Sequence, residues 1–163
     1  MTDTLHHVRY NRWATARTLE SVRPVTLEEF DRPIGGSYGS LRGTLAHIYM
    51  ADKIWWARLH GHPTGALSEF EQPADRAAWE QEWLAMLDRY NDWAPTADWN
   101  QVISYRDTKG NPYQSPIWQI LLHLTNHDSF HRGQVSNMLR QIGHAPAPQD
   151  LIVYYRTQAA AAG

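Results

Sequence analysis

Hydrophobic side chains recur every three or four residues in four long stretches of the chain. This spacing matches the 3.6-residue period of the α-helix, so each stretch predicts an amphipathic helix with one buried face. The predicted helices cover roughly residues 3–22, 41–60, 75–93 and 116–142. The second has the widest apolar face, which is typical of a helix at the centre of a bundle.

Capping residues mark the ends of two of these helices. Ser40 is a candidate N-cap for the second helix, and Gly61 suits the left-handed position just beyond its end. For the fourth helix, Ser115 is the candidate N-cap, and Pro116 fits the first helical position because its missing N–H needs no partner there. Gly143 closes the fourth helix.

Turn-forming residues lie outside the helices. Glycine and proline predict loops over residues 31–40 and 61–73. After Gly143, two prolines precede a short apolar run, and we expect this segment to be an irregular tail that packs back on the bundle.

A short β-like pattern precedes the fourth helix. Residues 102–106, the turn sequence D-T-K-G-N-P and Tyr113 predict two short strands around a turn. No repeat, low-complexity segment or linker interrupts the chain. We therefore expect one domain over residues 1–163, an all-α four-helix bundle with a hairpin-like segment before its last long helix.

Composition excludes several classes of protein and site. The chain has 163 residues, 42% of them hydrophobic, which suits a folded domain with a sizeable core. It contains no cysteine, so disulfides, thiolate metal sites and a cysteine nucleophile are excluded. A formal net charge of −2 gives no support for nucleic-acid binding. Without a signal-peptide pattern or a long apolar run, we expect a cytoplasmic protein that does not bind membranes.

Three histidines spaced four residues apart are the most distinctive chemical feature. They are His123, His127 and His131, and two imidazoles at this spacing on one helix can bind one divalent ion. At 100° per residue, His131 points close to the centre of the apolar face and His127 lies roughly 40° from it. His123 lies about 100° from the centre, towards solvent, and is a weaker candidate. His47 in the second helix can face a bundle partner.

Structural roles are the alternative for these residues. A single histidine on an apolar helix face, such as His47, is more often a hydrogen-bonded core residue than a metal ligand. Two inward imidazoles favour a metal, because burying both without partners would be unfavourable. Asn126 and Asp128 are candidates to orient an imidazole, with solvent exposure as the alternative. No general base is identifiable from spacing alone.

Two separated motifs carry a family resemblance. Residues 39–61 read G-S-L-R-G-T-L-A-H-I-Y-M-A-D-K-I-W-W-A-R-L-H-G, and residues 126–135 read N-H-D-S-F-H-R-G-Q-V. Together they resemble the DinB/YfiT-like superfamily, specifically its DinB family, over nearly the whole chain. The resemblance implies up-down-down-up helix connections, often a homodimer, and a divalent metal, nickel or zinc. It implies that His47, His127 and His131 hold the metal.

The resemblance leaves the reaction open. Relatives in the superfamily include transferases and isomerases that use a low-molecular-weight thiol. A three-histidine metal keeps an open position and can lower the pKa of bound water, or of a thiol, to about 7. Thiol-dependent S-transfer and hydrolysis on a small-molecule substrate are therefore both expected classes. A non-catalytic, metal- or ligand-binding stress-response protein is the alternative, followed by a metal-free bundle with structural histidines.

Overall fold

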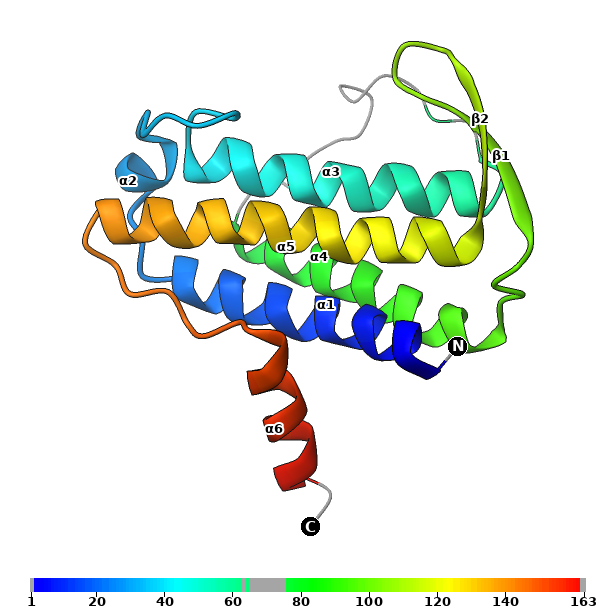
Figure 1. The fold of residues 1–163 in the computed structure, drawn as a ribbon. Coiled ribbons are helices and arrows are strands. Elements are labelled where there is room, and N and C mark those ends of the chain that lie inside the picture. The colour runs from blue at the N-terminus through cyan, green and yellow to red at the C-terminus, as the bar shows by residue number, and fades with distance from the viewer. Residues whose placement is uncertain (1, 63, 65–75, 162–163) are drawn as a thin grey trace.

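Four long helices lie side by side and form a bundle (Figure 1). The computed structural model describes residues 2–62, 64 and 76–161. The long helices are α1 (Thr2–Val22), α3 (Leu41–Leu59), α4 (Arg76–Trp93) and α5 (Ile117–Gln141). In Figure 1, α1 and α5 run in one direction and α3 and α4 in the other. The all-α bundle with up-down-down-up connections is therefore confirmed.

The hairpin expected before the last long helix is also present. Strands β1 (Val102–Arg106) and β2 (Pro112–Pro116) pair in antiparallel orientation. Asp107 stabilises the turn between them, because its carboxylate accepts hydrogen bonds from the backbone N–H groups of Lys109 and Asn111. The hairpin lies at the end of the bundle where α3 ends and α5 begins (Figure 1).

The start of α5 differs from the sequence prediction. The helix begins at Ile117, Pro116 occupies the N-cap position with an extended backbone, and Ser115 belongs to β2. Its first two backbone N–H groups donate to the carbonyl oxygens of Gln101 and Trp99, so no side-chain cap is needed. The predicted Ser115 cap is wrong because strand pairing continues one residue beyond it.

The other predicted caps are confirmed. The Ser40 hydroxyl accepts a hydrogen bond of 3.1 Å from the backbone N–H of Gly43 at the start of α3. Gly61 and Gly143 follow α3 and α5 with φ angles of 69° and 87°. These angles lie in the left-handed region that glycine adopts without a steric penalty, which explains why both helices end there.

A short helix precedes the predicted loop at residues 31–40. This helix is α2 (Leu27–Asp31), and the hydrophobic pattern did not predict it. Thr26 and Glu29 form a reciprocal capping box at its start, each side chain accepting from the other's backbone N–H. The T-x-x-E spacing is the local signal that predicts such a helix start.

The C-terminal segment is more regular than predicted. Helix α6 (Leu151–Ala161) takes the place of part of the expected irregular tail and projects from the bundle (Figure 1). Tyr154 anchors it, because this side chain is buried against the rings of Tyr10 and Trp13 on α1. The non-helical residues before α6 do pack on the bundle: the carbonyl oxygen of Gln149 accepts a hydrogen bond from the Tyr10 hydroxyl.

The bundle core brings together the apolar faces of the four long helices. Its largest fully buried aliphatic side chains on α3 and α5 are Leu41, Leu45, Ile48, Ile117, Ile120, Leu121 and Leu139. Burial of each such side chain contributes about 1.5–3 kcal/mol relative to leaving it exposed. Helices α3 and α5 pack directly against each other, so the core fixes the two helices on which the histidines lie.

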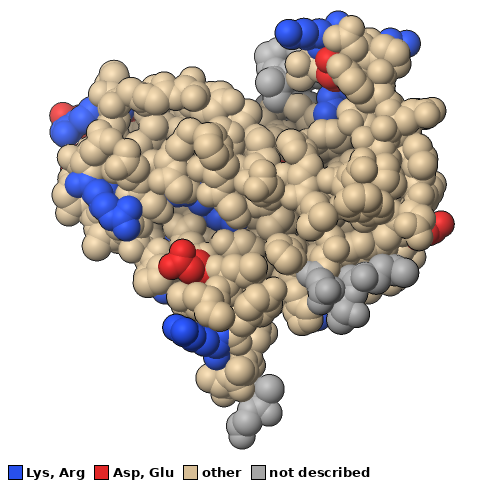
Figure 2. All heavy atoms as spheres, viewed as in Figure 1, with Lys and Arg blue, Asp and Glu red and all other residues tan. Residues whose placement is uncertain are grey.

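Charged side chains are sparse on one face of the molecule. The face shown in Figure 2 is mostly uncharged, with its basic and acidic side chains in small separate groups. Within the described parts of the chain, no helix is both long and apolar enough to span a lipid bilayer. A single domain over residues 1–163 stays a prediction.

Candidate metal centre

Three histidines from two helices converge between α3 and α5. His47 comes from α3, and His127 and His131 come from adjacent turns of α5. One ligand atom from each lies within 4.8 Å of the other two. The Nε2 atoms of His47 and His127 are 2.9 Å apart. The structure thus brings together the three histidines singled out in the sequence, in a group that can hold a metal ion.

His123 lies outside this group. Its side chain is exposed on α5, and its ring lies edge-on to Trp55, with centroids 5.3 Å apart. This placement agrees with its direction on the helical wheel, about 100° from the centre of the apolar face.

Asp128 orients the imidazole of His127. Its carboxylate is fully buried, and one oxygen accepts a hydrogen bond of 3.1 Å from Nδ1 of His127. The other oxygen accepts from the side-chain amide of Asn11 at 2.6 Å. A proton fixed on Nδ1 leaves the lone pair of Nε2 free for a metal, which is the usual role of a carboxylate behind a histidine ligand. Asn126, the other candidate for this role, is exposed.

Gln134 does the same for His131. Nδ1 of His131 lies 2.9 Å from the side-chain oxygen of Gln134, one turn further along α5. This leaves Nε2 of His131 as its free ligand atom. The spacing of three residues between His131 and Gln134 on one helix is the local signal for such a contact.

Two of the three histidines have lowered pKa values. Burial, followed by the positive charges of His127 and His131, lowers the pKa of His47 to about 4. Burial is also the main cause that lowers the pKa of His131. Neutral imidazole is the form that binds a metal, so the lowered pKa values of His47 and His131 favour metal binding at neutral pH.

A buried polar network lies behind the cluster. Asp52 on α3 is fully buried and accepts a hydrogen bond of 2.7 Å from the indole N–H of Trp83. Burial, followed by the charge of Asp128, raises the pKa of Asp52 well above its ordinary value. The raised pKa favours the protonated form of Asp52 at this buried position. The buried guanidinium of Arg132 donates to Asn11, which links it to the same network.

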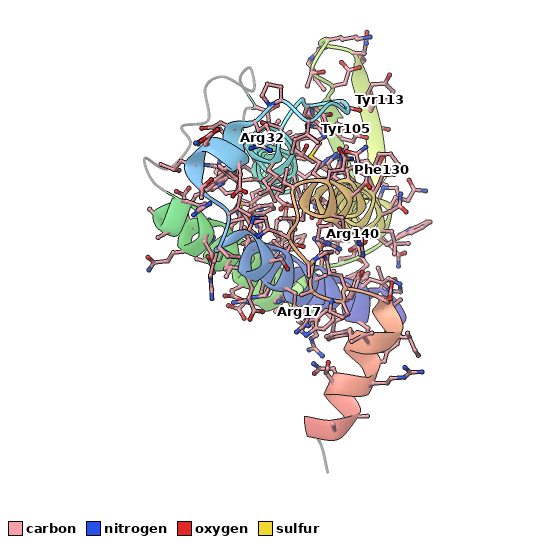
Figure 3. The ribbon with its side chains drawn as sticks, turned by 90° about the vertical axis from the view of Figure 1, so that its left-hand side faces the viewer. Arg17, Arg32, Tyr105, Tyr113, Phe130 and Arg140 are labelled. Carbon is pink, nitrogen blue, oxygen red and sulfur yellow. The ribbon has the colours of Figure 1, made fainter. Side chains whose placement is uncertain are left out.

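Aromatic side chains surround the histidines on the outside. The ring of Phe130 is 65% exposed and lies edge-on to His131. From His123 a row of ring contacts continues through Trp55 to Tyr105 and Tyr113 on the hairpin. Figure 3 shows Phe130 and the two hairpin tyrosines on one side of the bundle.

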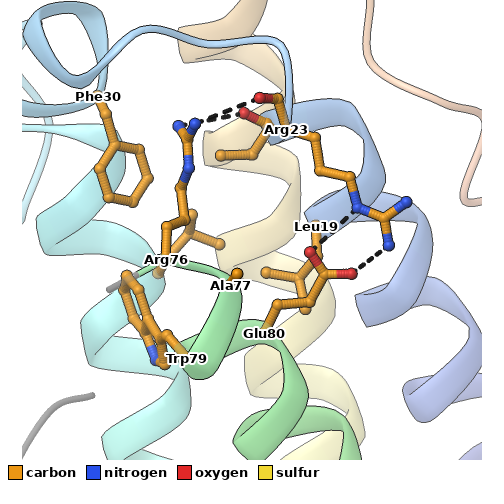
Figure 4. A pocket seen from close by; sticks show the side chains of 9 residues that line it. Leu19, Arg23, Phe30, Arg76, Ala77, Trp79 and Glu80 are labelled. Carbon is orange, nitrogen blue, oxygen red and sulfur yellow. Dashed lines mark hydrogen bonds and ion pairs between the residues drawn. The ribbon is translucent and has the colours of Figure 1, made fainter. Parts of the chain in front are cut away.

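A cavity of about 230 Å³ lies apart from the histidines, between α1, α2, α3 and α4 (Figure 4). It is lined by Leu19, Val22, Arg23, Phe30, Leu45, Arg76, Ala77, Trp79 and Glu80 and shares none of them with the histidine cluster. Its charged groups already have partners. Arg23 pairs with Glu80, and Arg76 donates to the carbonyl oxygen of Val25 at 2.6 Å. These contacts hold the start of α4 against the end of α1.

Comparison with known proteins shows the family of the chain. The DinB family model matches residues 1–161. The chain belongs to the DinB family. Protein DinB of Bacillus subtilis (strain 168) is 26% identical over 153 residues, covering 89% of each chain. The crystal structure of a DinB-like protein from Bacillus cereus ATCC 10987 superposes with a TM-score of 0.69 at 19% identity, covering 91% of this chain and 96% of that one.

Proposed function

We propose that this DinB family protein is a metal-dependent enzyme that binds nickel or zinc through His47, His127 and His131. The observation that carries the proposal is the convergence of three imidazoles, two of which are held by Asp128 and Gln134 with Nε2 free. Three neutral nitrogen ligands suit either metal, and availability in the cell decides between such ions as much as affinity does.

A small-molecule transfer or hydrolysis is the chemistry that we propose for this centre. A bound divalent ion supplies Lewis acidity, which lowers the pKa of a coordinated water or thiol to near neutral pH. The chain has no cysteine, so a thiol would come from a low-molecular-weight cosubstrate. The exposed rings around the cluster, Phe130 among them, would bind the substrate by stacking and apolar contact.

Metal analysis tests the first half of the proposal. Protein purified without a nickel column or a chelator should contain close to one nickel or zinc per chain by elemental analysis. His47→Ala, His127→Ala and His131→Ala should each lose that metal. His123→Ala is the matched control on the same helix and should retain it. Wild-type protein that takes up neither metal would contradict the proposal and favour structural histidines.

Turnover assays test the second half. Metal-loaded protein should conjugate a low-molecular-weight thiol to an electrophile, or hydrolyse an ester or amide, and His127→Ala should not. Metal binding without turnover in either class would favour the second candidate, a non-catalytic metal- or ligand-binding protein of a stress response. The hydroxyl of Tyr38, 2.9 Å from Nε2 of His47, favours that candidate because a further protein ligand would restrict access.

A further inference from the structure

Tyr38 places a phenol oxygen beside His47 in the histidine cluster. It lies in the loop between α2 and α3, and its side chain is 38% exposed. Its ring stacks on His47 with centroids 3.9 Å apart and lies edge-on to His131 at 5.5 Å. No sequence motif singled out this residue, because its position depends on the path of a loop.

The hydroxyl of Tyr38 lies slightly closer to His47 than two ligands of one ion would lie to each other. It is 2.9 Å from Nε2 of His47, and Nε2 of His127 is the same distance from that atom. Donor atoms in a tetrahedral zinc site with bonds of 2.0–2.1 Å are about 3.3 Å apart. The rings of Tyr38 and His47 stack at an inclination of 16°, which holds the phenol beside the imidazole.

The loop is built to keep Tyr38 close to α3 and α5. A Cβ atom at Gly43 would lie 2.1 Å from the backbone carbonyl oxygen of Tyr38, so only glycine lets the loop rest on the first turn of α3. Gly36 and Gly39, on either side of Tyr38, have φ angles of 78° and 75°. A Cβ atom at Gly36 would lie 3.3 Å from the methyl group of Met138 on α5. The loop backbone is thus fitted against both helices that carry the histidines.

We propose that Tyr38 is the fourth protein ligand of this centre in its resting state. Its oxygen binds as a phenolate, with the hydroxyl proton released to water, and completes a set of three nitrogens and one oxygen. Tyr38 is the most exposed of the four side chains and the only one on a loop. Substrate would therefore enter by exchange for the phenol oxygen. This inference rests on the proposed metal site and specifies how its fourth position is filled.

A spectroscopic test separates the inference from the proposed function. Wild-type protein loaded with Cu²⁺ should show a phenolate-to-copper charge-transfer absorption band. Tyr38→Phe should bind copper with the same stoichiometry but lack this band. Its affinity for Zn²⁺ should fall by at least about 10–100-fold, the range typical when a group that supports a metal ligand is lost. Tyr113→Phe removes an exposed phenol on the hairpin and should retain both properties.

Gly43→Ala provides a second, independent variant. This variant retains the Tyr38 side chain, but the added methyl group pushes the loop away from α3. It should therefore weaken the charge-transfer band as well. Circular dichroism confirms that each variant is folded. A wild-type protein that binds copper without the band, or a band that persists in Tyr38→Phe, would overturn the role of Tyr38 and leave the three-histidine site intact. A wild-type protein that binds no metal would overturn both.

Discussion

Asp128 and His127 are neighbours in the sequence, and the fully buried carboxylate of Asp128 accepts a hydrogen bond from Nδ1 of His127 at 3.1 Å. We expect Asp128→Asn to lower the affinity for Zn²⁺ by 10–100-fold, on the order found for other carboxylates behind histidine ligands. The amide lacks the negative charge that makes the imidazole a stronger ligand. Competition with a chelating dye measures the change. Asn126→Ala, an exposed change one residue before His127, is the control and should leave affinity unaltered.

The raised pKa of Asp52 predicts a pH dependence of stability. The folded protein holds this proton more tightly than the unfolded chain, so stability falls as pH rises above the ordinary aspartate pKa of about 3.9. Each unit by which folding raises the pKa corresponds to about 1.4 kcal/mol. Asp52→Asn mimics the protonated acid and should remove this loss.

Urea unfolding at pH 5 and pH 8 measures the effect. The variant should gain stability relative to the wild type as pH rises. Asp52→Ala is the matched variant, because it removes the acceptor of the Trp83 indole N–H and should cost about 1–3 kcal/mol at both pH values. Equal slopes for wild type and Asp52→Asn would mean that Asp52 is ionised in the fold.

The lowered pKa of His47 predicts the opposite slope in acid. Folding disfavours protonation of this imidazole, so the metal-free protein should lose stability as pH falls from about 6.5 to about 4. Thermal unfolding in the presence of a chelator across this range measures the loss. His47→Gln removes the group and should flatten the curve between those two values. An unchanged curve in the variant would assign the acid sensitivity to other residues.

Helix α6 makes a further prediction about assembly. Ile152 and Tyr155 are exposed on this helix while Tyr154 is buried against α1. We expect the protein to be a homodimer, and light scattering coupled to gel filtration should give twice the mass of one chain. Truncation after residue 150 should lower the melting temperature, because it removes Tyr154 and exposes the rings of Tyr10 and Trp13 to solvent. A monomeric mass for the full chain would contradict the expected homodimer.

Orientation around a helix could be predicted from the sequence, whereas contacts made by loops could not. His127 and His131 were separated from His123 by angle alone, because the turn per residue is nearly constant within a helix. The pairing of these residues with His47 came from the family resemblance. Tyr38 reaches the cluster only because the loop before α3 packs on that helix at Gly43. The spacing of residues along the sequence does not predict the path of this loop.

The buried acids show a second limit of sequence analysis. Asp52 and Asp128 lie on different helices, and their proximity depends on how α3 and α5 pack. Polar residues at these positions are equally compatible with a solvated helix face, so composition and period do not distinguish the two. The predicted Ser115 cap failed for a related reason: backbone carbonyl groups from a segment before the hairpin took its place.

The carbonyl groups of Gln101 and Trp99 accept hydrogen bonds from the first turn of α5. These contacts also determine the direction in which the histidine side chains further along the helix point. A helix that started one residue earlier or later would rotate every later side chain by about 100° about its axis. His127 and His131 would then face away from His47. The segment before the hairpin thus fixes the position at which α5 begins. We expect an insertion in the hairpin turn, around Gly110, to leave the cluster intact, because the turn lies outside these contacts.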